Sequence, residues 1–186
     1  MWWRRESGRQ GAGEPEGEPE GARPTEQSGR PAPAVTLRPM SEEEYGAFRV
    51  VLDEQYARDA ARARDISLEE ARVVTGRQVA EQLKDGLATE GHHLWKVVSA
   101  QGGPVGDLWV FVEPAQHAAF IYDISISEQH RGTGYGKAAM LAVESAVRTM
   151  GAAHIDLNVF GYNTPARRLY EGLGYEPFAI GMRKAL

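Results

Sequence analysis

The sequence contains no cysteine, and this absence excludes several kinds of site at once. The chain has no disulfide, no thiolate metal ligand and no cysteine nucleophile. A chain of 186 residues without disulfides depends on its apolar core, and a hydrophobic share of 42% is sufficient for one. The lack of cysteine fits a reducing compartment, so we expect a cytoplasmic protein.

Long apolar runs and an excess of positive charge are also missing. No stretch approaches the roughly eighteen apolar residues that span a bilayer, so we expect no membrane association. The opening stretch MWWRRESGRQ carries charges without the apolar segment of a secretory signal. The net charge is −5. Because nucleic-acid-binding proteins usually show a basic stripe, we expect no nucleic-acid partner.

The first part of the chain differs in composition from the rest. The stretch GAGEPEGEPEGARPTEQSGRPAPA consists mainly of glycine, proline, glutamate and a few polar residues. A segment so poor in apolar residues cannot bury enough surface to offset the entropy of ordering. We therefore predict a disordered tail over residues 1–34 and one folded domain over residues 35–186.

Apolar periodicity in this domain predicts strands and helices in a mixed order. The expected elements are a strand at 35–40, helices capped by Ser41 and Ser67, strands at 92–100, 105–113 and 118–127, a helix ending near Gly151, a strand at 154–160, a helix that has Thr164 or Asn163 as N-cap, begins with Pro165 and stops at Gly174, and a final strand at 178–186. This order predicts an α/β or α+β layer fold with one sheet. Ala118 to Phe160 should form a parallel crossover.

The stretch RGTGYGKAAM, Arg131 to Met140, places three glycines directly before a helix. Glycine lets the backbone turn tightly, and the first N–H groups of the helix point outward with about half a positive charge. This combination favours a phosphate site, although a tight turn without a ligand stays open as an alternative. The loop is no Walker A motif, because Ala138 follows Lys137, and no dinucleotide fingerprint, because Lys137 occupies the third glycine position. A nucleotide-binding oxidoreductase is therefore disfavoured.

Three stretches occur in a characteristic order: ISISEQHRGTGYGKAAM, NTPARRLYEGLGY and GMRKAL. Together they resemble the GCN5-related N-acetyltransferase (GNAT) superfamily, and the resemblance covers residues 35–186. It implies a mixed, mostly antiparallel central sheet with a splayed parallel strand pair and helices on both faces. It also implies transfer of an acetyl group from acetyl-CoA to an amine.

The resemblance further implies that acetyl-CoA lies between the strands Ile121–Ser127 and Ile155–Phe160. The strand edge would pair with the pantetheine arm, and the glycine loop would bind the pyrophosphate. The implied contact residues are Ile124, Ser125, Ile126, Arg131, Gly132, Thr133, Gly134, Tyr135, Gly136, Lys137 and Asn163.

The implied reaction requires a group that removes a proton from the ammonium and a group that protonates the departing thiolate. Tyr170 would lie beside the thioester sulfur and is the expected general acid. Asp123 is the best single candidate for the base, while Glu113, His117 or a chain of waters remain alternatives. Because the chain has no cysteine, an acetyl-cysteine intermediate is excluded and direct transfer in a ternary complex is favoured.

Metal binding, the acceptor, an alternative function and the oligomeric state are the remaining points. The five histidines show no metal-ligand spacing, so we expect no metal; His92 and His93 are adjacent in a strand and should point to opposite faces. The acceptor is not legible, although acidic residues in the helices after Ser41 suit a cationic amine. A non-catalytic acyl-CoA-binding regulatory module is the alternative function. Either a monomer or a homodimer fits the sequence.

Overall fold

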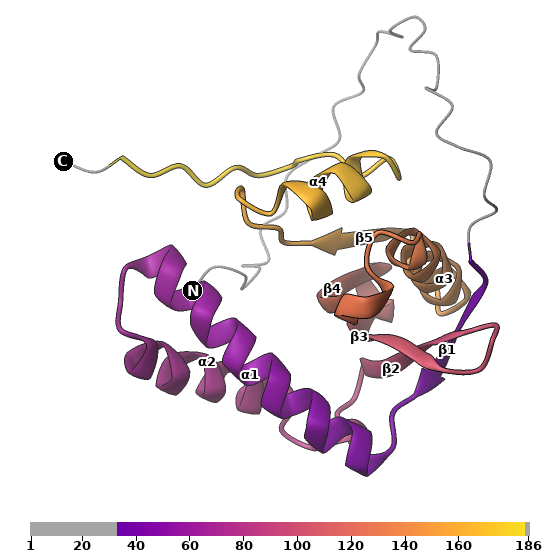
Figure 1. Ribbon diagram of the computed structural model, residues 1–186, viewed down its shortest axis with the longest axis horizontal. Helices are drawn as coiled ribbons and strands as arrows, with labels where there is room; N and C mark the ends of the chain where they lie inside the picture. Colours follow the sequence, from indigo (N-terminus) through magenta and orange to yellow (C-terminus); the bar gives the residue numbers. More distant parts are fainter. Residues whose placement is uncertain (1–32, 185–186) are drawn as a thin grey trace, which may run out of the picture. The chain divides into compact units, whose positions relative to one another are not determined.

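A computed structural model describes residues 33–184 of the chain. The predicted tail at residues 1–34 lies almost entirely outside the described residues. The elements are β1 (Val35–Pro39), α1 (Glu42–Arg64), α2 (Leu68–Gln82), the short 3-10 helix η1 (Gly86–Ala88), β2 (His92–Ser99), β3 (Pro104–Glu113), η2 (Pro114–Gln116), β4 (Ala118–Ile126), η3 (Glu128–His130), α3 (Tyr135–Thr149), β5 (His154–Leu157) and α4 (Thr164–Glu171) (Figure 1).

The strands of residues 33–184 form one five-stranded sheet in the order β1-β2-β3-β4-β5. The first three pairings are antiparallel, and β4 pairs with β5 in parallel. Because α3 lies between β4 and β5 in the chain, β4–α3–β5 is the parallel crossover that the sequence predicts. The mixed, mostly antiparallel sheet confirms the predicted fold class.

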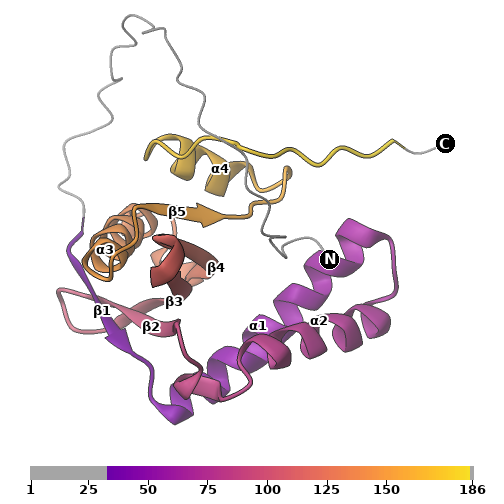
Figure 2. The same cartoon turned by 180° about the vertical axis from the view of Figure 1, so that it is seen from behind.

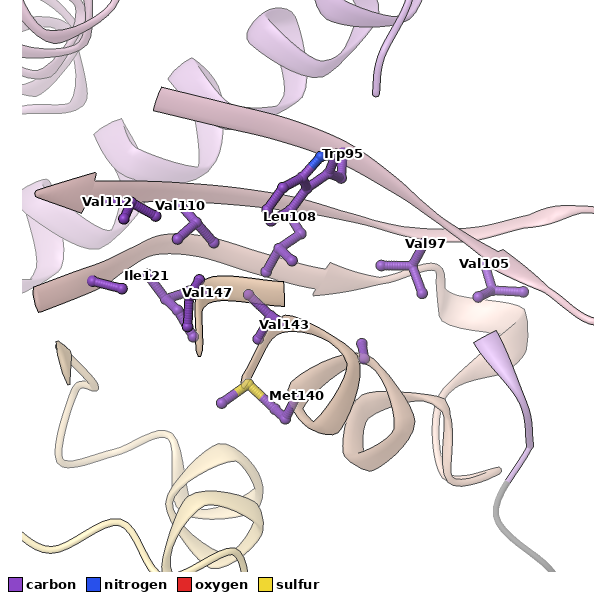
Figure 3. Packing of buried hydrophobic residues seen from close by; sticks show 12 residues of the cluster. Trp95, Val97, Val105, Leu108, Val110, Val112, Ile121, Met140, Val143 and Val147 are labelled. Carbon is purple, nitrogen blue, oxygen red and sulfur yellow. The ribbon is translucent and has the colours of Figure 1, made fainter. Parts of the chain in front are cut away.

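Strand β3 divides the core between the two faces of the sheet. Leu108 and Val110 are fully buried in a cluster that includes Met140 and Val143 of α3, as Figure 3 shows. Trp109, between them in the chain, is also fully buried but packs in a second cluster with residues of α1 and α2. This alternation follows from the two-residue period of a strand. Helices therefore cover both faces, as predicted.

Helix α1 begins with the predicted capping box. The hydroxyl of Ser41 accepts a hydrogen bond from the Glu44 amide at 3.2 Å, and the Glu44 carboxylate accepts one from the Ser41 amide at 2.9 Å. Arg38 of β1 donates to the same carboxylate at 2.6 Å. The Arg38 hydrogen bond, with that of the Ser41 backbone, lowers the pKa of Glu44 to about 2. These contacts fix the direction in which α1 leaves β1.

Three predicted boundaries are wrong. The strand expected at 154–160 ends at Leu157, because β5 loses its pairing with β4 there. The final strand expected at 178–186 is not formed over residues 178–184, which are exposed and have no strand beside them to pair with. Pro165 is the second residue of α4, since the helix begins at Thr164 after the N-cap Asn163.

Gly106 of β3 provides a test of how closely β3 and β4 approach. A Cβ atom at Gly106 would lie 2.2 Å from the backbone oxygen of Ser125 in β4. Since a backbone atom cannot move aside cheaply, we expect Gly106→Ala to lower the free energy of unfolding by about 1–3 kcal/mol in urea titrations. Gly103→Ala is the control, because no atom lies within 4 Å of its Cβ position. Equal losses of unfolding free energy in Gly106→Ala and Gly103→Ala would contradict this prediction.

Candidate active site

The site begins where β4 and β5 part. Their parallel register runs from Ala118 opposite His154 to Ile121 opposite Leu157 and then stops, although β4 continues to Ile126. On its other edge β4 remains paired with β3 as far as Ile126. The end of β4 therefore has an edge to which an extended ligand can add by backbone hydrogen bonding.

The glycine loop lies directly after this strand end. Gly132 and Gly134 have φ values of 72° and 94°, in the left-handed region that glycine adopts without strain. Gly134 is the N-cap of α3, and no side chain caps the helix there. The Arg131 guanidinium donates to the Ile126 carbonyl at 3.0 Å and so holds the loop against the end of β4. The uncapped N–H groups of α3 are suited to an anion.

Asp123 lies on β4, two residues after the last residue that pairs with β5 and before the glycine loop, opposite Trp109 of β3. Its side chain is buried, with 8% of the residue exposed. Burial raises its pKa to about 7, and the negative charges of Asp107 and Asp59 add to this effect, while a hydrogen bond from Ser125 opposes it. The carboxyl group can therefore exchange a proton close to neutral pH.

Tyr170 of α4 lies close enough to Asp123 for the two groups to interact electrostatically. Burial, followed by the charge of Asp123, raises the pKa of Tyr170 to about 12. The phenol therefore stays protonated at neutral pH. A carboxyl group near its titration point and a firmly protonated phenol are suited to opposite roles in proton transfer.

A β-bulge lies beside Asp123. Trp109 pairs with Asp123 and Val110 pairs with Ile121, so Tyr122 is the extra residue of β4. Its carbonyl accepts a hydrogen bond of 2.6 Å from the Tyr56 hydroxyl of α1. Bulges of this kind re-aim neighbouring side chains, and this one joins the middle of β4 to α1.

Aromatic rings form an apolar wall next to the bulge. Tyr122 stacks on Trp109 with 4.4 Å between ring centroids, and the Trp109 indole donates to Nδ1 of His92 at 2.9 Å. Burial lowers the pKa of His92 to about 4, so its imidazole is neutral. His93 stacks on Trp95 instead, which confirms that the two histidines face opposite sides. Among residues 33–184 no group of histidine, aspartate and glutamate has the arrangement of a metal site.

The other candidate bases lie elsewhere. Glu113 ends β3, and His117 precedes β4 with its Nδ1 atom 3.1 Å from the Gly151 carbonyl. Both belong to the turn at the start of β4, whereas the glycine loop follows the end of that strand. Of these three candidate bases, Asp123 is the one whose charge acts on Tyr170.

The remaining sequence-predicted residues are arranged around the strand end. Ile124, Ser125 and Ile126 form the last part of β4, and Thr133, Tyr135, Gly136 and Lys137 belong to the loop and the first turn of α3. Asn163 caps α4, where its side-chain oxygen accepts from the Ala166 amide at 3.3 Å. That bond gives Asn163 a structural role. Contact of these residues with acetyl-CoA stays a prediction.

Sequence reasoning missed a link between α1 and the loop before α4. The Tyr162 hydroxyl donates to Asp59 at 2.7 Å, and the Arg62 guanidinium lies 3.8 Å from the centre of the Tyr162 ring. Tyr56, read from the sequence only as part of an apolar stripe, contributes a second link through its hydroxyl. The signal in the sequence for these links was the run of tyrosine and charged residues along α1, which belongs to the region expected to receive the acceptor.

The comparisons with known proteins agree with this geometry. The family model described as Acetyltransferase (GNAT) family matches residues 43–175. The chain belongs to the GNAT acetyltransferase family. The resemblance inferred from the glycine loop and the Asn163–Tyr175 stretch is thereby confirmed.

Two GNAT relatives come from Bacillus subtilis strain 168. The uncharacterized N-acetyltransferase YycN is 36% identical over 154 residues, which cover 82% of this chain and 99% of YycN. The uncharacterized N-acetyltransferase YdgE is 32% identical over 155 residues, with the same shares of 82% and 99%. The crystal structure of YycN superposes with a TM-score of 0.78 at 35% identity, again over 82% and 99% of the chains. Within residues 33–184 no helix has the length and apolar character to cross a membrane.

The raised pKa of Asp123 predicts how stability depends on pH. Burial lifts the pKa from its usual 3.8 to about 7, so the folded chain binds this proton more tightly than the unfolded chain. The corresponding stability is present at low pH and is lost as pH rises through this interval. We expect Asp123→Asn to be more stable than the parent at pH 8, by up to about 4 kcal/mol in urea titrations, with little difference at pH 4.

The exposed carboxyl of Asp85 supplies the control for this measurement. Asp85→Asn should change the free energy of unfolding little at either pH. A stabilisation by Asp123→Asn that has the same size at pH 4 and pH 8 would show that ionisation of Asp123 is not its cause.

Proposed function

We propose that this protein transfers the acetyl group of acetyl-CoA directly to a primary amine within a ternary complex. The observation that carries the proposal is that Asp123 lies two residues beyond the last β4–β5 pair and acts electrostatically on Tyr170 of α4. Family membership supports acetyl-CoA as the co-substrate. The proposed catalytic domain is residues 35–186.

The described residues fit coenzyme A. Its diphosphate needs several hydrogen-bond donors, and the glycine loop offers backbone N–H groups at an uncapped helix start. Arg131 and Lys137 are exposed cations beside these groups, and charge-assisted hydrogen bonds of this kind are stronger than neutral ones. The amides of the pantetheine arm match the backbone edge of Ile124–Ile126. This orientation directs the thioester toward Asp123 and Tyr170.

In the proposed reaction the bound thioester supplies an activated acetyl group, and side chains of the protein accept and donate the protons. The Asp123 carboxylate takes one proton from the incoming ammonium, directly or through water. The neutral amine then attacks the carbonyl carbon, so that a C–N bond forms and the C–S bond breaks. Tyr170 donates its proton to the departing thiolate and regains one from the new amide nitrogen.

Charge around Asp123 supports a cationic acceptor. The negative charges of Asp59 and Asp107 both act on Asp123, and Asp59 lies on α1, the helix that borders the site through Tyr56. A positively charged amine entering from this side would be attracted before it loses its proton.

Release of free thiol from acetyl-CoA in the presence of a panel of primary amines tests the proposed activity. We expect turnover with at least one amine and binding of coenzyme A in calorimetry. Tight binding of coenzyme A without turnover on any amine would favour the non-catalytic acyl-CoA-binding module. Absence of binding at millimolar coenzyme A would overturn both.

Replacement of Tyr170 tests the acid. Because general acid catalysis contributes roughly 10²–10⁴-fold, we expect Tyr170→Phe to lower turnover by about that factor with little change in the affinity for coenzyme A. Tyr175→Phe is a matched control, because its ring lies 5.8 Å from that of Tyr170 and the same hydroxyl group is removed. Unchanged turnover in Tyr170→Phe would remove this residue from the mechanism.

A further inference from the structure

Polar side chains form a row across the sheet that ends next to the proposed base. Arg38 of β1 is opposite Lys96 of β2, and Lys96 is opposite Asp107 of β3. Asp107 is in turn opposite Ser125 of β4. Residues directly opposite each other point to the same face of a sheet. The row therefore reaches β4 two residues beyond Asp123.

This row lies on the face of the sheet that α1 and α2 cover. Asp107 and Trp109 are two residues apart on β3, so their side chains point to the same face, and Trp109 packs with residues of both helices. Figures 1 and 2 show these helices on one side of the strands and α3 on the other. Asp123 is opposite Trp109. The row and Asp123 therefore share the face beneath α1 and α2.

Lys96 and Asp107 form an ion pair within this row, between the Lys96 Nζ atom and the Asp107 Oδ1 atom. Only 16% of the Lys96 side chain and 24% of the Asp107 side chain are exposed. Salt screens partly buried charges much less than exposed ones, and loss of one partner leaves a charge that little water can compensate. Lys96 therefore cancels much of the electrostatic effect that the Asp107 carboxylate would otherwise have on its neighbours.

Asp107 is a diagonal neighbour of Asp123, because it lies opposite Ser125, which follows Asp123 by two residues. Diagonal neighbours in an antiparallel pair are about 7–8 Å apart. At this separation one charge alters the ionisation of another when little water lies between them. Burial is the largest cause of the raised pKa of Asp123, and the negative charge of Asp107 is the next.

Groups on the other elements around Asp123 also interact with it. They are Asp59 and Tyr56 of α1, Tyr170 of α4 and Ser125 of β4. The Asp59 carboxylate accepts a hydrogen bond from the neutral hydroxyl of Tyr162, whereas the Asp107 carboxylate is bound by a cation. Lys96 has a second carboxylate nearby, that of Glu44 at the start of α1, which is paired with Arg38 at 2.6 Å. The effect of Asp107 on Asp123 thus depends on Lys96.

We propose that Lys96 and Asp107 are positioning residues that keep Asp123 able to accept a proton from the acceptor amine at neutral pH. Lys96 limits the repulsion between the two carboxylates, so that Asp123 can ionise. Asp107 keeps the ionised Asp123 basic enough to take up a proton. The consequence for catalysis rests on the proposed function, in which Asp123 is the base, whereas the electrostatic coupling itself does not.

Titration of the Asp123 carboxyl group by carbon-13 NMR on the full chain tests the coupling, and Asp123→Asn identifies the signal. We expect Lys96→Met to raise the titration midpoint by roughly one pH unit, because the Asp107 carboxylate is then uncompensated. We expect Asp107→Asn to lower it by about as much, because the Lys96 ammonium is then without its partner. A midpoint that stays in place, or that moves in the same direction in both variants, would overturn the proposal.

The double variant Lys96→Met/Asp107→Asn separates charge from packing. It removes both charges and leaves neither partner unpaired, so we expect a midpoint between those of the single variants. Arg77→Met and Glu81→Gln are matched controls, because this ion pair on α2 has the same charges on side chains that are 82% and 65% exposed. Each control should leave the Asp123 midpoint in place. A double-variant midpoint outside the range of the single variants would show that charge is not the cause.

The pH dependence of kcat/KM for thiol release tests the role in the reaction. With an amine that is turned over, the acidic limb should move to higher pH in Lys96→Met and to lower pH in Asp107→Asn, as the NMR midpoints do. A limb that stays in place while the midpoints move would refute the positioning role. If no amine is turned over by the parent, the proposed function fails, and the NMR titration still decides whether Lys96 and Asp107 control the ionisation of Asp123.

Discussion

The parting of β4 and β5 is the constraint on which the rest of the site depends. The strands run in parallel and α3 connects them, so the glycine loop must lie at the end of β4. Pairing that stops at Ile121 leaves the later backbone of β4 at an edge. Beyond this point Asp123 of β4 lies close enough to Tyr170 of α4 to act on it electrostatically. One interruption of the β4–β5 pairing thus leaves a backbone edge directly before the glycine loop and the uncapped start of α3.

Burial of Asp123 affects both the stability of the fold and the proton transfer proposed for this site. An isolated carboxylate inside a protein is costly, and its pKa rises until the neutral form competes. A core residue chosen only for stability would be apolar or neutral here. Retention of the carboxyl group close to Tyr170 therefore fits the trade between stability and activity that enzyme sites commonly show. Tyr56, which binds the bulge through a hydroxyl, holds the surrounding backbone in position.

Much of the fold was predictable because its signals are local. Alternation along β3, the capping box at Ser41 and the glycines before α3 all act over a few residues. The same holds for the placement of Asp123 on a strand and Tyr170 on a helix. The end of β5 and the unformed last strand were predicted wrongly, since a strand exists only where another strand lies alongside.

By itself the sequence determined the order of the elements, the absence of thiol chemistry, the glycine loop before α3 and the family to which these belong. Only the tertiary structure decided which carboxyl group titrates near neutrality. That property depends on burial and on the charges of Asp59 in α1 and Asp107 in β3, which are distant in the chain and meet only in the folded protein. It also decided that residues 178–184 form no strand, because strand pairing depends on the position of a neighbouring edge.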